Sequence, residues 1–187
     1  MSRIESTPDI GAEVGVAMAA SPSIGATIKH HYDVECYGPD GCLKWKDSFD
    51  NLVTTAGKNK YLDATLKTGL AAPLWYVGLV TGPTETDYNV ADTMASHAGW
   101  TEFTTYSTTP RPAFTPGAIA AGSVSNTASK AVFAINGGGG TVSGAFMADE
   151  STVGGATGTL LGVGAFVSDR VVISGDTLNV TITCTMS

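Results

Sequence analysis

The chain has 187 residues, of which 43% are hydrophobic and 14% charged, with a net charge of −7. The apolar content excludes a disordered protein, because it is sufficient for a buried core. The sequence contains no basic run, which argues against nucleic acid as a partner, because neutralising phosphates requires clustered Lys and Arg. No apolar stretch approaches the roughly 20 residues of a membrane helix, so we expect no membrane partner.

Residues 1–27 differ in composition from the rest and are rich in Ala, Gly, Ser and Pro. Pro8 and Pro22 would interrupt a regular element, and the segment has too little apolar mass to fold alone. It also lacks the basic and apolar regions of a signal peptide. We predict an extended N-terminal arm, which is either a disordered tail or a strap that orders on a neighbouring subunit. Its candidate contact residues are Ile4, Ile10, Val14 and Met18.

A β-hairpin is the clearest local prediction. Apolar side chains and His30 alternate with polar ones over residues 28–36, and a second strand follows the Gly-Pro-Asp-Gly turn over residues 43–49. A period of two is typical of a half-buried strand. Cys36 and Cys42 flank the turn, so a disulfide is geometrically conceivable, but free thiols are expected in a chain without a secretory signal.

A helix and a buried strand follow the hairpin. Thr55 is predicted to cap a helix over residues 56–67, with Tyr61, Leu62 and Leu66 as its buried stripe. The nearly continuous apolar run over residues 74–80 predicts a central strand that is covered on both faces.

The next element is a long polar connection that reaches residue 112. It includes one predicted helical turn that begins at Asp92. Connections of this length within a compact domain are usually functional, so we interpret it as a contact surface. Trp100 and Tyr106 are its expected exposed aromatic residues, and Arg111 is the third candidate contact residue.

The last third, from residue 123, consists of short Val-, Ile-, Thr- and Phe-rich runs separated by glycine-rich turns. This pattern predicts strands, with the four glycines at residues 137–140 as a hairpin tip. The fold expected for residues 28–187 is therefore mainly β: a single antiparallel β-sandwich, jelly-roll-like, with one short helix.

No pattern predicts a catalytic residue, a metal site or a cofactor. His31, Asp33 and Glu35 share one strand face and are interpreted as solvated. His97 and Asp92 lie near Ser96, but no serine has the Gly-x-Ser-x-Gly surroundings of a nucleophile elbow. The acidic residues lie at predicted turns without calcium-loop spacing.

Several segments together resemble a known group of proteins. They are residues 51–55 (NLVTT) with 61–63 (YLD), 75–79 (WYVGL), 92–102 (DTMASHAGWTE) and 175–180 (GDTLNV). These strings resemble small structural proteins from the morphogenesis regions of tailed bacteriophages. The resemblance covers about residues 43–186 and implies a virion component without catalytic residues.

We therefore expect a non-enzymatic virion protein that is made in the bacterial host cytoplasm. Within this class we favour a capsid decoration, or cement, protein that forms a homo-oligomer and binds the major capsid protein or other virion proteins. The arm and loops would then add many modest contacts over a lattice. A head fibre, a head-to-tail adaptor or a tail component is the alternative, and a carbohydrate- or receptor-binding module is the further alternative.

Overall fold

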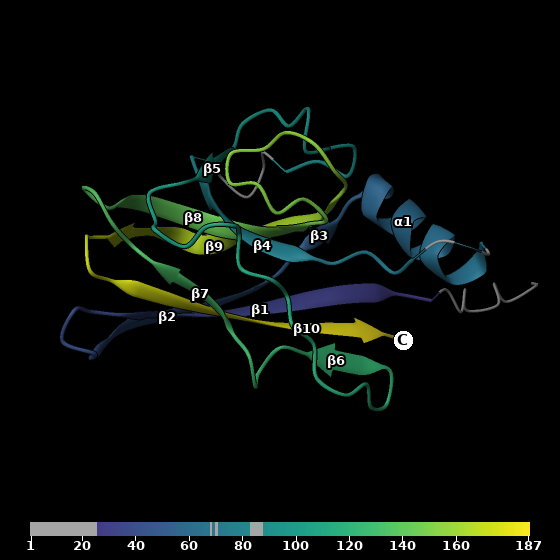
Figure 1. Ribbon diagram of the computed structural model, residues 1–187, viewed down its shortest axis with the longest axis horizontal. Coiled ribbons are helices and arrows are strands. Elements are labelled where there is room, and N and C mark those ends of the chain that lie inside the picture. Colours follow the sequence, from purple (N-terminus) through teal and green to yellow (C-terminus); the bar gives the residue numbers. More distant parts are fainter. Residues whose placement is uncertain (1–25, 68, 70, 83–87) are drawn as a thin grey trace, which may run out of the picture.

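The computed structural model describes residues 26–67, 69, 71–82 and 88–187. Two antiparallel five-stranded sheets face each other and enclose the main core (Figure 1). The β1 sheet has the order β2-β1-β10-β6, with β7 also paired to β10, and contains β1 (Ile28–Tyr37), β2 (Leu43–Asp50), β6 (Ser123–Ser125), β7 (Ala131–Ala134) and β10 (Thr177–Met186). The β8 sheet has the order β3-β9-β8-β4-β5 and contains β3 (Leu52–Val53), β4 (Tyr76–Thr81), β5 (Thr101–Phe103), β8 (Gly140–Ala148) and β9 (Leu160–Val172). The predicted mainly β, antiparallel sandwich is confirmed.

The predicted hairpin of β1 and β2 is also confirmed. Tyr32, Val34 and Cys36 are fully buried, while their neighbours along β1 are more exposed. Tyr32 lies opposite Phe49 of β2, and the two rings stack with their centroids 4.9 Å apart. The alternation places one face of β1 in the core, as a period of two requires.

Strand β10 pairs with β1 along the whole length of both strands. The register runs from Ile28 opposite Met186 to Tyr37 opposite Thr177. Just beyond this pairing, Thr27 and Ser187 exchange two backbone hydrogen bonds, of 2.6 and 3.0 Å. The start of β1 and the C-terminus therefore lie side by side at one end of the sandwich.

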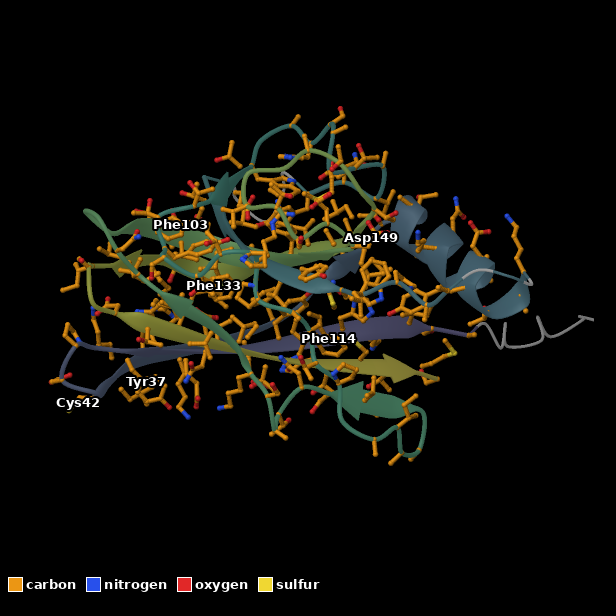
Figure 2. The ribbon with its side chains drawn as sticks, viewed as in Figure 1. Tyr37, Cys42, Phe103, Phe114, Phe133 and Asp149 are labelled. Carbon is orange, nitrogen blue, oxygen red and sulfur yellow. The ribbon has the colours of Figure 1, made fainter. Side chains whose placement is uncertain are left out.

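Strand β4 lies between β8 and β5, as the apolar run over residues 74–80 predicts. Its interior residues from Val77 to Val80 are all buried. Gly78 is required here, because a Cβ atom at this position would lie 2.2 Å from the Phe146 ring of β8. Phe103 and Phe133 come from opposite sheets and lie in the space between the two layers (Figure 2).

Helix α1 (Thr55–Leu66) packs on β9 at the end of the sandwich (Figure 1). Its N-cap is Thr54 rather than Thr55: the buried Thr54 hydroxyl accepts a 3.0 Å hydrogen bond from the Gly57 amide. The first turn of α1 lies close to the backbone of β9, because a Cβ atom at Gly57 would lie 2.3 Å from the Leu161 carbonyl oxygen.

The predicted buried stripe of the helix is wrong for two of its three residues. Leu62 and Leu66 are 55% and 76% exposed, and only Tyr61 is partly buried. The physical reason is that only the first turn of α1 rests on β9, whereas the later turns extend past the end of the β8 sheet (Figure 1).

The four glycines at residues 137–140 are not a hairpin tip. They connect β7 in the β1 sheet to β8 in the β8 sheet, so the chain changes layers at this point. Gly139 has a φ of +70°, and a Cβ atom there would lie 2.1 Å from the Val172 carbonyl oxygen. Glycine is needed because the connection has a left-handed backbone pressed against β9.

Candidate functional site

The described part of the long connection, residues 88–112, is packed against the protein. Trp100, Tyr106 and Arg111 are only 3%, 4% and 1% exposed, so the prediction that Trp100 and Tyr106 are exposed aromatic residues is wrong. Residues 88–100, together with residues 149–159, cover the outer face of the β8 sheet (Figure 1). A second, smaller apolar cluster, which includes Trp100 and Phe146, lies beneath these loops.

Trp100 is held by Asp92 and His97, which lie close to it in the sequence. Its indole Nε1 donates a 3.1 Å hydrogen bond to Asp92, while His97 stacks on the ring at 3.8 Å and contacts the Trp100 carbonyl oxygen at 2.9 Å through Nδ1. Residues 93–96 form a tight turn instead of the predicted helical turn. The reason is that the Asp92 carboxylate accepts from Trp100 and the Asn89 amide rather than capping a helix.

Arg111 and Glu102 form a buried bidentate ion pair that we call the clasp. Arg111 Nε donates to one Glu102 oxygen at 2.8 Å and its NH2 group to the other at 2.7 Å. The guanidinium also donates to the carbonyl oxygens of Glu150 (2.7 Å) and Gly155 (3.2 Å), and lies over the Phe146 ring.

The clasp joins two loops that are distant in sequence. Glu102 accepts further hydrogen bonds from the Gly154 amide, at 2.6 Å, and the Tyr106 hydroxyl, at 3.2 Å. Burial and the adjacent Glu102 carboxylate raise the pKa of Tyr106. Each Glu102 oxygen thus accepts two hydrogen bonds, and four guanidinium N–H groups of Arg111 are bonded, which makes a buried charge pair tolerable. Arg111 and Tyr106 therefore fix the shape of the loop surface.

The outer face of the β1 sheet is polar, as predicted for His31, Asp33 and Glu35. Glu35 accepts from Lys46 at 2.6 Å and from Lys130 at 2.9 Å, and these ammonium groups lower its pKa to about 2. No group of three His, Cys, Asp or Glu side chains in the described part of the chain is placed to hold a metal ion.

An apolar groove of about 350 Å3 opens at the α1 end of the sandwich. Among the residues that the structure describes, no charged one lines it. Its walls come from α1, the start of β1, the end of β10, and β6 with the loop before it. The lining residues are Ile28, Tyr61, Thr65, Ile119, Gly122, Ser123, Val124, Cys184, Thr185 and Met186.

The groove lies between Tyr61 of α1 and the paired ends of β1 and β10. Tyr61 is fixed on one wall by His30, whose Nε2 lies 2.9 Å from the Tyr61 hydroxyl. His30 Nδ1 faces the Asn51 amide nitrogen, a donor, at 3.1 Å. The tautomer that matches a donating Asn51 amide carries its proton on Nε2 and donates it to Tyr61. Burial lowers the pKa of His30 to about 4 and keeps it neutral.

A comparison with protein-family models identifies the family of this chain. Residues 52–185 match the family model described as podophage GP4 fiber I protein gp80. The chain belongs to this family. It is thus a structural protein of a tailed-phage virion, in agreement with the resemblance seen in the sequence. No curated protein matches the chain.

The fiber I match covers the clasp, helix α1 and most of the groove. It begins at β3 and leaves out the arm, β1 and β2. As a virion structural protein, the chain contacts other virion proteins. No helix in the described ranges is long and apolar enough to cross a membrane.

The structure brings together only part of the predicted contact set. Trp100, Tyr106 and Arg111 lie in one loop cluster, although as internal supports, and their role in contacts between proteins stays a prediction. Ile4, Ile10, Val14 and Met18 lie outside the described residues. Sequence reasoning missed the groove. The signal was the apolar ends of two strands, Ile28 and Met186, which are paired to each other.

Proposed function

We propose that this chain is a non-enzymatic fibre component of the virion, made in the bacterial host cytoplasm and assembled onto the particle as a homo-oligomer. The family match over residues 52–185 carries the proposal, because it covers the folded domain from β3 almost to the end of β10. A head fibre, one of the alternatives expected from the sequence, fits the family name.

The side chains that would be suspected of catalysis support a contact role. Asp92 and His97 both bind Trp100, and the clasp residues satisfy one another. A catalytic base needs a free position toward a substrate. These groups are instead engaged in holding loops.

The capsid decoration role stays a prediction, as do the adaptor, tail and receptor-binding roles. No feature of the fold favours any of them over a fibre. The roles differ in the location of the protein in the particle and in its copy number.

Immunogold electron microscopy of intact virions, with antibody raised against the purified chain, tests the proposal. A fibre component gives label at discrete projections. Label spread over the whole capsid would instead indicate decoration, and label confined to the tail tip would indicate a tail component. Particles pre-incubated with an excess of the purified chain control for specificity.

A further inference from the structure

The groove at the α1 end belongs to an unusually apolar surface. Ile119 and Met186 line it and are 78% and 53% exposed, and Leu66 on the adjacent helix is 76% exposed. A monomeric protein rarely leaves such a cluster open, so an apolar patch of this kind marks an interaction site. The groove itself, about 350 Å3 in volume, has room for a few aliphatic side chains.

The N-terminal arm contains a segment of matching chemistry. Val14, Val16 and Met18 alternate with Gly15 and Ala17, and no charged residue occurs between Val14 and Ala20. In an extended chain, residues two apart point to the same side. Such a segment would present three apolar side chains to one surface, and its small intervening residues would allow a close approach.

We propose that the groove binds residues 14–18 of the arm of a second copy of this chain. The root of the arm is fixed at the groove, since Thr27 pairs with Ser187 and Ile28 lines the wall. The start of each arm therefore lies beside the groove of its own chain, and the proposal is that the segment is exchanged with a neighbouring copy.

The length of the arm suits an exchange between copies. The seven residues from 19 to 25 span up to about 25 Å when extended. That reach brings the Val14 segment of one copy to the groove of a neighbour packed against the same end. The inference rests on the proposed function only in taking copies to lie side by side in the virion. Repeated exchange would then link them by multivalency.

Disulfide trapping between two singly substituted chains tests the exchange. One chain carries Val16→Cys and the other, distinguishable by an affinity tag, carries Met186→Cys. Both also carry Cys42→Ser and Cys184→Ser, which remove the exposed thiol at the far end of the molecule (Figure 2) and the native thiol that lines the groove. After mild oxidation of the mixture we expect a disulfide-linked heterodimer.

Ala17→Cys is the matched control, because it points to the opposite side of an extended segment from Val16. Its heterodimer yield with Met186→Cys should be several-fold lower. Equal yields for the two positions, or no heterodimer, would overturn the proposal. So would a disulfide that forms only when Val16→Cys and Met186→Cys are on the same chain, because the arm would then occupy its own groove.

Sedimentation of the full-length protein gives a second readout. We expect concentration-dependent self-association that Val16→Asp weakens several-fold and that Ala17→Asp leaves close to wild type. Identical behaviour of the two variants would contradict the proposal. Both experiments use the isolated protein, so their failure would leave the virion location, tested by immunogold labelling, unaffected.

Discussion

The outer face of the β8 sheet and the α1 end of the sandwich differ in how far their apolar side chains are covered. On the outer face of the β8 sheet, Trp100 and Phe146 are sealed beneath loops that the Arg111–Glu102 clasp ties together. At the α1 end, Ile119 and Met186 remain exposed around an open groove. The apolar side chains of the first surface are covered by loops of the same chain, whereas those of the second are open to a partner. Changes at the first should therefore affect folding, and changes at the second should affect association.

The largest expected effect is at the clasp. Arg111→Met leaves the Glu102 carboxylate buried without its partner, which should lower the free energy of unfolding by about 3–5 kcal/mol. Denaturant unfolding of the purified protein measures this. Lys46→Met is the matched control, since Lys46 pairs with Glu35 while its side chain is 60% exposed, and it should cost much less stability than Arg111→Met. Similar losses for the two variants would show that the buried clasp contributes no more to stability than an exposed ion pair.

The next effect is a pH dependence that originates at His30. Its pKa is about 4 in the folded protein against 6.5 when unfolded. Between these values the unfolded chain binds more protons, so stability is complete above about pH 6.5 and falls as the pH drops toward 4. The loss approaches about 3 kcal/mol. Glu35 has a pKa of about 2 in the folded protein against 4.5 ordinarily, so the stability that its ionised form contributes is lost only below about pH 4.5.

Unfolding free energies measured at several pH values from 4.5 to 7 test this. His30→Gln, which keeps a polar side chain beside Tyr61, should flatten the slope in this window. An unchanged slope would assign the dependence to other groups.

A smaller effect distinguishes the two candidate caps of α1. Thr54→Ala removes the hydroxyl that accepts from the Gly57 amide, and should cost about 1–2 kcal/mol. Thr55→Ala, one residue later and exposed, should change stability little. Thermal unfolding of the two variants compares them directly, and a larger loss at Thr55 would contradict the cap seen here.

The smallest effect on stability is expected at the rim of the groove. Ile119→Ser should alter the unfolding free energy by no more than about 0.5 kcal/mol, because the side chain is 78% exposed. It should nevertheless weaken self-association several-fold in sedimentation. Val167→Ser is the control, since Val167 on β9 is 80% exposed but does not line the groove. Equal self-association of the two variants would speak against the groove as an interface.

What the sequence predicted correctly depends on neighbours in the chain. The period of two along β1 is local, so it indicated the buried face of Tyr32 and Val34. The strand at residues 76–81 followed from its apolar run in the same way. The family resemblance was carried by local strings and was also confirmed.

The failures concern residues whose surroundings come from distant parts of the chain. Trp100 is buried against Phe146, and Arg111 is held by Glu150 and Gly155, about 40 residues away. The polar composition of their loop led to the prediction that it is exposed. Leu66 was expected to be buried because nothing in the helix sequence shows where the sheet beneath it ends. The groove was missed for the same reason, since its walls come from four separate segments.

The pairing of β1 with β10 also has a mechanical consequence. Thr27 and Ser187 lie side by side, so tension applied between the arm and the C-terminus would peel the two strands apart one hydrogen-bond pair at a time. Tension between the arm and the far hairpin tip would instead run along the covalent backbone of β1, which is already extended and joins the two points directly. The covalent chain carries that load without requiring the hydrogen bonds between β1 and β10 to break. A subunit anchored by its arm would thus withstand pulling on its distal end better than pulling on its own C-terminus.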